Sequence, residues 1–365
     1  MLRPTLASLT VTKLRDPQPA ATWLELLKGL PQLVELRLTD AVELLDVLPI
    51  AVPAPVEAAT LNKLKSITLG DHGSGITCAN LLNCISFPKS AETELYADVP
   101  GDEDELVFVV AAIADKGRVC SGVIGQPLPA RALSVDTWRL DMGTSVTIYT
   151  QVNASATCGE IDAQEGEDLD SLPISAILRL PTSPDDVLQA FVALHPINEV
   201  RSFRALSVSL CEDTWSVLAR ELPNLRELEA GVAEETAMSL FRHLRLHPFS
   251  FPTVSRLRIP CIRWHEQHIG QYRHWARSGC LLSPLIKAAK VRKRSGLPIN
   301  FLELPYCVNL DDEGKCEVHL RRLRKPVGVF QYDIGEMEDP CDSCQSSDDE
   351  SDDDDEIDHE PGGER

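Results

Sequence analysis

His265, Glu266 and His268 resemble the HExxH motif of zinc proteases, and His274 lies close behind them. A zinc-binding pair on one helix needs histidines four residues apart, whereas His265 and His268 are three apart. A polar helical surface therefore explains this segment better than a metal site does. We predict no metal ligands and no cofactor from it.

Cys341 and Cys344 form a CxxC pair that Cys307, Cys316 and His319 could join in a zinc cluster. A zinc ribbon needs a second, regularly spaced pair, which this chain lacks. A redox role needs a strand–helix context, which the acidic surroundings do not provide. A metal-dependent enzyme is thus the weakest hypothesis, and we expect no enzymatic activity.

The segment Asp71-His72-Gly73-Ser74-Gly75 contains the residue types of a nucleophilic serine site. It lacks the GxSxG frame, which would need glycine at position 72. We interpret it as a polar loop after a strand that ends at Leu69. The glycine motifs that cradle nucleotide phosphates do not occur in the chain, so nucleotide binding has no support.

Two short segments concentrate positive charge. They contain Lys287, Lys290, Arg292, Lys293 and Arg294, and then Arg321, Arg322, Arg324 and Lys325. One interpretation is a nuclear-import signal. Another is a set of solvated cations at helix C-termini, where the helix dipole favours them. A third is a docking site for the acidic tail of the chain.

That tail carries most of the negative charge of the protein. The 365 residues have a net charge of −21, and residues 336–365 contribute one Arg and fifteen Asp or Glu, or 1 − 15 = −14. A segment so charged and so poor in apolar residues is predicted to be disordered. Ser346, Ser347 and Ser351 each precede an acidic residue by three positions, which predicts phosphorylation by a casein-kinase-2-type kinase.

The remaining 335 residues carry only −21 + 14 = −7, a balance that argues against a general nucleic-acid binder. The longest apolar run covers 106–114, too short for the roughly 20 residues that cross a bilayer, so no membrane association is expected. The N-terminus has no secretory signal pattern, and the eleven cysteines are an odd number that is mostly scattered singly. We expect a cytoplasmic or nuclear protein with reduced cysteines.

A repeated leucine pattern predicts the elements that position these side chains. The spacing LxxLxxLxL, with Ile, Val, Phe or Ala as variants, occurs at 30–38, 61–69, 222–230 and 251–259, with a degraded copy at 172–180. The last two apolar positions are two apart and so face one side of a strand, whereas the earlier ones are three apart, as in a turn or helix end.

Amphipathic helices are predicted between the repeats. They cover 106–113, with Asp102 or Asp104 as the cap and Gly117 as the stop, and then 184–194 after Ser183, 213–222, 237–244 and 283–294. Strands are expected at 132–135 and 146–150. The prediction is an α/β fold, a leucine-rich-repeat-like solenoid of irregular helix–strand repeats over 1–335, followed by the disordered acidic tail over 336–365. The alternative is a non-repetitive α/β domain with chance leucine matches.

Residues that flank the buried LxL positions are predicted to point to the concave face and to bind protein partners. They are Glu35, Arg37, Ser66, Thr68, Glu227, Glu229, Arg256 and Arg258. In the second half of the chain these residues would place an acidic row beside a basic row, an arrangement that suits a charged partner surface. The alternative is that they are solvated edge positions.

The runs LPQLVELRL, LNKLKSITL, LPNLRELEAG and FPTVSRLRIP resemble fungal F-box proteins with divergent leucine-rich repeats. In that family an N-terminal F-box binds the Skp1 adaptor, and the repeats hold the protein to be ubiquitinated. The resemblance implies the substrate-recognition part of an SCF-type ubiquitin ligase. Repeat-like Leu6, Leu9 and Leu14 occupy the place of an F-box, as in a truncated gene model or a relative without the box, so Skp1 is a doubtful partner. A repeat adaptor or regulatory protein without a ubiquitin link is the alternative.

Overall fold

The computed structural model of the chain describes residues 4–43, 58–71, 75–88, 90–97, 103–119, 130–138, 143–149, 174–194, 197–231, 234–260, 282–305 and 315–332. Several predicted features lie outside these residues. They are the 265–274 histidines, Cys307, the Cys341–Cys344 pair, and the tail over 336–365 with Ser346, Ser347 and Ser351.

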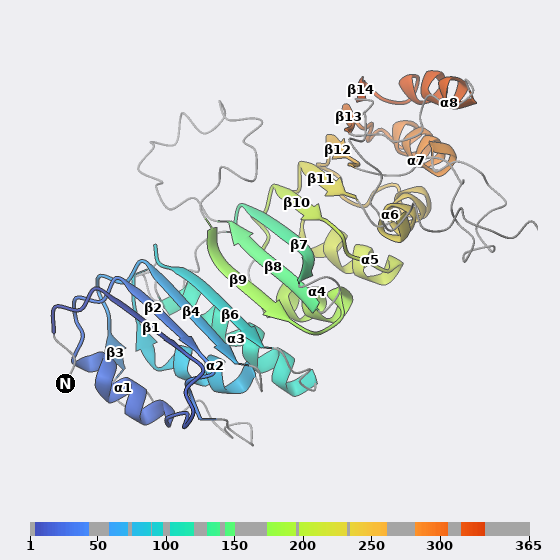
Figure 1. Ribbon diagram of the computed structural model, residues 1–365. Helices are drawn as coiled ribbons and strands as arrows, with labels where there is room; N and C mark the ends of the chain where they lie inside the picture. The colour runs from blue at the N-terminus through green and yellow to red at the C-terminus, as the bar shows by residue number, and fades with distance from the viewer. Residues whose placement is uncertain are drawn as a thin grey trace, which may run out of the picture.

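One twelve-stranded sheet runs through the described part of the chain, from blue to red in Figure 1. Its spatial order is β1 (Ser8–Thr12), β2 (Glu35–Thr39), β4 (Ser66–Asp71), β6 (Glu92–Ala97), β9 (Ile174–Leu180), β8 (Gly143–Tyr149), β7 (Ala132–Trp138), β10 (Ser202–Ala205), β11 (Glu227–Ala230), β12 (Arg256–Arg258), β13 (Phe301–Leu304) and β14 (Val329–Tyr332). Every neighbouring pair is parallel except the two that involve β8. The fold is therefore mixed α/β with a mostly parallel sheet.

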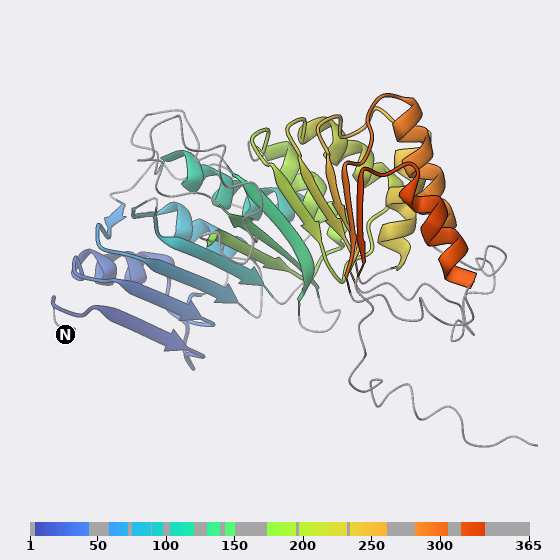
Figure 2. The ribbon, with the colours of Figure 1, turned by 90° about the horizontal axis from the view of Figure 1, so that it is seen from above.

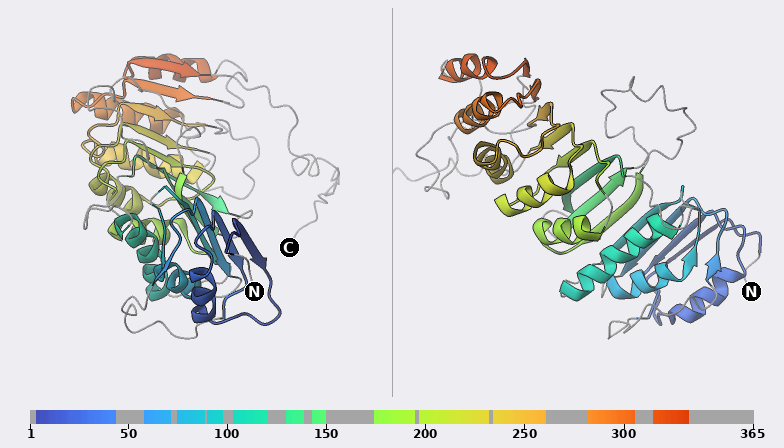
Figure 3. Two further views of the ribbon diagram at one scale, coloured as in Figure 1. Left: turned by 90° about the vertical axis from the view of Figure 1, so that its left-hand side faces the viewer. Right: turned by 180° about the vertical axis from the view of Figure 1, so that it is seen from behind.

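The helices of the described part lie on one face of this sheet and leave the other face open (Figures 2 and 3). They are α1 (Ala20–Lys28), α2 (Gly75–Asn83), α3 (Glu103–Val119), α4 (Pro184–Leu194), α5 (Glu212–Glu221), α6 (Glu234–Leu246), α7 (Leu282–Arg294) and α8 (Lys315–Arg324). A two-stranded sheet of β3 (Ala59–Thr60) and β5 (Ile85–Ser86) completes the described elements. None of the described helices combines the length and the apolar character needed to cross a membrane.

The leucine spacing has a direct structural cause. The first two apolar positions of each repeat close one turn, in which the second amide donates to the first carbonyl. These bonds join Leu33 to Leu30 (3.1 Å), Leu64 to Leu61 (3.1 Å), Leu225 to Leu222 (3.3 Å) and Val254 to Phe251 (3.1 Å). The last two positions lie in a strand, except that Ile259 directly follows β12, and all eight residues are at most 2% exposed against the helices. The predicted turn-then-strand unit is confirmed at all four copies.

The helix boundaries confirm some sequence signals and contradict others. The Ser183 hydroxyl accepts a hydrogen bond from the amide of Asp186 (3.2 Å), as a helix cap does, and α4 begins at Pro184. Gly117 does not end α3, which continues to Val119, because a glycine costs a helix only about 1 kcal/mol. Helix α7 begins at Leu282, one residue before the predicted cap Ser283.

The centre of the sheet departs from the simple helix–strand alternation. After α3 the chain forms β7, β8 and β9 as a meander, and β9 returns to pair with β6. Strand β7 therefore lies on the opposite side of β8 from β9, and its other edge pairs with β10. The predicted strands at 132–135 and 146–150 correspond to β7 and β8, although position 150 lies outside the described residues.

A tyrosine on the open face fixes the packing of three neighbouring strands. Tyr96 is 7% exposed, and its hydroxyl lies 3.0 Å from the Thr39 hydroxyl across β4. Gly70 lies between them, and a methyl group added there would come within 2.0–2.4 Å of the Tyr96 ring. The absence of a side chain at Gly70 therefore allows the ring to cross β4.

Gly70→Ala should lower the free energy of unfolding by about 1–3 kcal/mol, because the new methyl group overpacks the ring. The loss should be smaller when Tyr96→Ala is already present, since the clash is then gone. Urea denaturation of the two single variants and the double variant measures this coupling. Additive losses would contradict the assigned clash.

Candidate protein-interaction surface

The open face carries one continuous row of side chains that crosses all twelve strands. Parallel and antiparallel register pair each member with the next, from one edge of the sheet to the other. This central row consists of Thr10, Arg37, Thr68, Glu94, Ile177, Thr147, Ser134, Arg204, Glu229, Arg258, Glu303 and Gln331. Eleven of its twelve residues are polar or charged, so this face is built for contact with water or a polar partner.

All eight residues predicted to bind a partner lie on the open face, but in two separate groups. Glu35, Arg37, Ser66 and Thr68 come from β2 and β4, whereas Glu227, Glu229, Arg256 and Arg258 come from β11 and β12. Six strand spacings separate β4 from β11, which is about 30 Å at about 4.8 Å for each spacing. The structure therefore brings together the residues within each group and keeps the groups apart.

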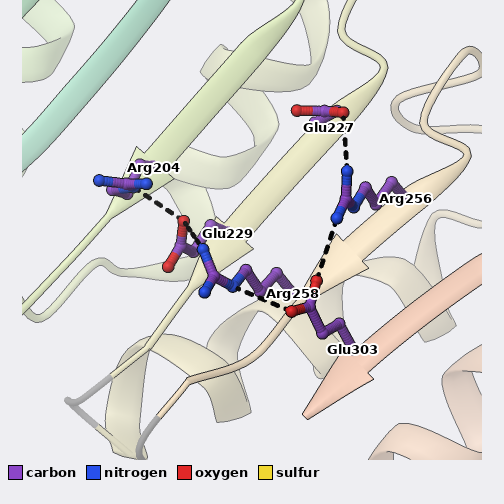
Figure 4. A network of polar contacts seen from close by, with 6 residues as sticks. All are labelled: Arg204, Glu227, Glu229, Arg256, Arg258 and Glu303. Carbon is purple, nitrogen blue, oxygen red and sulfur yellow. Dashed lines mark hydrogen bonds and ion pairs between the residues drawn. The ribbon is translucent and has the colours of Figure 1, made fainter. Parts of the chain in front are cut away.

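The second group belongs to a network of ion pairs with two further residues, Arg204 and Glu303 (Figure 4). Glu229 accepts from Arg204 at 2.8 Å and lies 3.8 Å from Arg258. Arg258 lies 3.7 Å from Glu303, which also lies 3.2 Å from Arg256. Arg256 reaches Glu227 at 3.5 Å and covers the ring of Phe301 at 4.9 Å from its centroid. We call the six charged residues the arginine–glutamate network.

The network contains three arginines and three glutamates, so its formal charge is zero. The sequence predicted an acidic row on β11 beside a basic row on β12. Arg204 on β10 lies on the other side of the acidic row, and Glu303 on β13 lies on the other side of the basic row, so each row has opposite charge on both sides. The leucine spacing did not identify these two residues, because their strands, SFRA and FLEL, do not follow the full pattern. The alternation of buried Phe203 and Ala205 in the first of these strands is the signal that would have found it.

Exposure divides the network into two layers. The Arg204 and Glu229 side chains are 11% and 13% exposed, whereas those of Arg256 and Arg258 are 38% and 34% exposed. The inner pair therefore acts mainly within the protein. Each outer guanidinium group lies within 4 Å of two carboxylates, and the Nε atom of Arg258 is buried without a hydrogen-bond partner among the described residues. The partly exposed ends of both side chains are where a carboxylate or carbonyl oxygen of a partner can accept a hydrogen bond.

The first group has weaker internal contacts. Glu35 and Arg37 are exposed, and Glu35 accepts a hydrogen bond from the Ser8 hydroxyl at 3.2 Å. Thr68 donates to Glu94 at 3.2 Å, and Glu94 also forms an ion pair with Arg179. The residues next to these charges are mainly serines and threonines. This half of the open face therefore carries fewer charges than the other half.

A histidine–serine contact inside the protein invites comparison with a nucleophilic dyad. His243 of α6 places Nε2 at 2.9 Å from the Ser250 hydroxyl and Nδ1 at 3.5 Å from the Ser216 hydroxyl. Its ring is 1% exposed. Burial, helped by the nearby charge of His247, lowers the pKa of His243 from 6.5 to about 4. The neutral ring therefore joins α5, α6 and the 247–250 turn, a packing role with no access for a substrate.

Arg292 contradicts its assignment to a solvated basic segment. It is 1% exposed, and its guanidinium group donates to the carbonyl oxygens of Pro248 (3.2 Å), Ser250 (2.6 Å) and Phe251 (3.1 Å). Burial lowers the pKa of Arg292 from 12.5 to about 10, so the group stays charged near neutral pH. It fixes the turn before β12, where Phe251 adopts a positive φ of 50°.

Metal ligation has no centre in the described part of the chain, where no group of three or more His, Cys, Asp or Glu side chains is arranged to hold an ion. Comparison with known proteins adds no relative. No protein-family model matches the chain, and no curated protein matches its sequence. The resemblance to F-box proteins with leucine-rich repeats thus stays a prediction based on the repeats.

Arg204→Met and Glu229→Leu should each lower the free energy of unfolding by about 1–3 kcal/mol, because each removes the 2.8 Å ion pair of a largely buried partner. The double variant should lose less than the sum, with a coupling of about 1 kcal/mol or more. Urea denaturation of the wild type, both single variants and the double variant measures this coupling energy. The exposed Lys28–Glu25 pair on α1 is the control, and an equally small coupling at both sites would contradict the assignment.

The His243 contact predicts a specific loss of stability in acid. Below pH 6.5 the unfolded chain binds a proton at this histidine, and the folded protein does so only near pH 4. Stability is therefore complete above pH 6.5 and falls between pH 6.5 and 4, by an amount that approaches about 3 kcal/mol at 1.36 kcal/mol for each pKa unit. His243→Gln should flatten this part of the unfolding curve, whereas His247→Gln, at an exposed site, should keep it. Parallel curves for wild type and H243Q would contradict the prediction.

Proposed function

We propose that the protein is a non-enzymatic scaffold that captures protein partners on the open face of its sheet. The observation that carries this proposal is the central row, which spans eleven strand spacings, or about 50 Å. A standard protein interface covers about 800 Å² on each partner, roughly 30 Å across. The open face is thus long enough to hold such an interface.

The arginine–glutamate network is the proposed contact point on this face. Its zero net charge gives little long-range attraction, so a partner is selected by short-range complementarity to Arg256 and Arg258. Arginine is also enriched among the residues that dominate protein interfaces. A partner surface with closely spaced carboxylate or carbonyl oxygens would match it.

We further propose that the helix–strand units form a leucine-rich-repeat-like solenoid. The repeated LxxL turns and the sequential packing of α4 to α8 beside β10 to β14 support this interpretation. A substrate-recognition role in an SCF-type ubiquitin ligase follows from the sequence resemblance alone. An adaptor without a ubiquitin link would use the same surface.

Arg256→Ala combined with Arg258→Ala should reduce partner capture about tenfold or more, because it removes the exposed donors of the network. Tagged full-length protein in cells of its own source, followed by quantitative mass spectrometry, measures capture. Arg242→Ala with Arg245→Ala, on the exposed side of α6, is the matched control.

Urea denaturation first establishes that both variants are folded. Loss of the same captured proteins in both variants, or in neither, would contradict a binding site on the open face. Skp1 among the captured proteins would favour the ubiquitin-ligase role, and its absence would favour the adaptor.

A further inference from the structure

The two basic segments of the sequence form one surface in the folded protein. Helices α7 and α8 pack side by side at the end of the sheet (Figure 1). The Lys293 ammonium group donates to the backbone carbonyl of Lys325 at 2.7 Å, so the C-terminal ends of the two helices are joined. Segments about thirty residues apart in sequence thus contribute cations to the same place.

We call this surface the α7–α8 basic patch. Its members are exposed cations from both helix ends: Lys290, Lys293, Arg294, Arg322, Arg324 and Lys325. None of the six forms an ion pair within the described part of the chain, in contrast with Arg204, Arg256 and Arg258 on the open face. The six members thus carry a formal charge of +6 that no ion pair among the described residues offsets, and such a charge favours a polyanion.

A strongly acidic segment, opposite in charge to the patch, begins a few residues after the last strand. Strand β14 ends at Tyr332, and residues 336–365 carry a net charge of −14. Helix α8 ends at Arg324, five residues before β14 begins at Val329, so the joined helix ends lie near the start of that strand. The four residues of β14 span about 13 Å. The most acidic run begins at Asp348, 348 − 332 = 16 residues after Tyr332, and a polar coil of that length spans about 20–24 Å. The run can therefore reach the patch.

We propose that the acidic tail over 336–365 docks on the α7–α8 basic patch of the same molecule. Covalent linkage keeps the tail at an effective concentration in the millimolar range, so even weak attraction fills the site. The contact depends on charge, and salt at about 0.5 M should weaken it because the screening length then falls to about 4 Å. External anions would bind this surface only by displacing the tail.

Carboxyl–amine cross-linking of the full chain, read by mass spectrometry, tests the proposal. At about 20 mM salt the tail carboxylates should cross-link to Lys293 and Lys325, and at about 0.5 M salt the yield should fall roughly fivefold or more. A variant with Lys290→Gln, Arg294→Gln, Arg322→Gln and Arg324→Gln keeps both reporter lysines, and it should lose a similar fraction at low salt.

The matched control removes four exposed cations elsewhere, with Arg15→Gln, Lys63→Gln, Lys65→Gln and Arg245→Gln, and should keep the wild-type yield. A mixture of isotopically light and heavy protein should give cross-links within molecules. Equal yields in the two quadruple variants would overturn the proposal, as would cross-links mainly between molecules or spread over all surface lysines.

Discussion

The register of the parallel sheet is the constraint on which the rest of the structure depends. Because strand side chains alternate between faces, a slip of one residue would turn the buried leucines to solvent and the charged residues into the core. The LxxL turns prevent that slip by fixing where each strand begins. The amide of Lys65, just after one such turn, donates to the carbonyl of Val34 at 2.7 Å, and equivalent bonds link later units. Each turn thus aligns its strand with the preceding one.

This constraint explains which features the sequence could predict. The buried positions Leu36 and Leu38, or Leu257 and Ile259, follow from spacing within one unit, and they are confirmed. Lateral partners do not follow from such spacing, because they come from other units. Arg256 pairs with Glu303, which lies 47 residues later in the sequence. This separation is longer than the repeat period of about 30 residues, so the leucine pattern does not predict the pair. The network was therefore predicted in part, as residues on a face, while its pairing required the structure.

The prediction that Arg292 is solvated was also wrong, and the reason lies in its position on helix α7. Arg292 stands among cations in the sequence, but it follows Leu285 and Ala289 at helical spacing and so lies on the buried side of α7. The three carbonyl oxygens that it binds belong to one turn, over residues 248–251. A long side chain with several fixed donors can satisfy such a turn from a neighbouring helix, and a leucine cannot. Helical position thus identifies the residue better than composition does.

The two charged surfaces of the protein differ in the kind of recognition that they support. The arginine–glutamate network on the open face has three positive and three negative charges, so their fields largely cancel beyond a few ångströms and a partner recognises Arg256 and Arg258 only on contact. The six cations of the α7–α8 basic patch have no ion-pair partner among the described residues, so they act over a distance set by ionic strength. A partner that docks on the sheet would be selected by shape and hydrogen bonding. A polyanion on the helices would be selected by charge and by proximity, and a segment of the same chain satisfies both conditions at once.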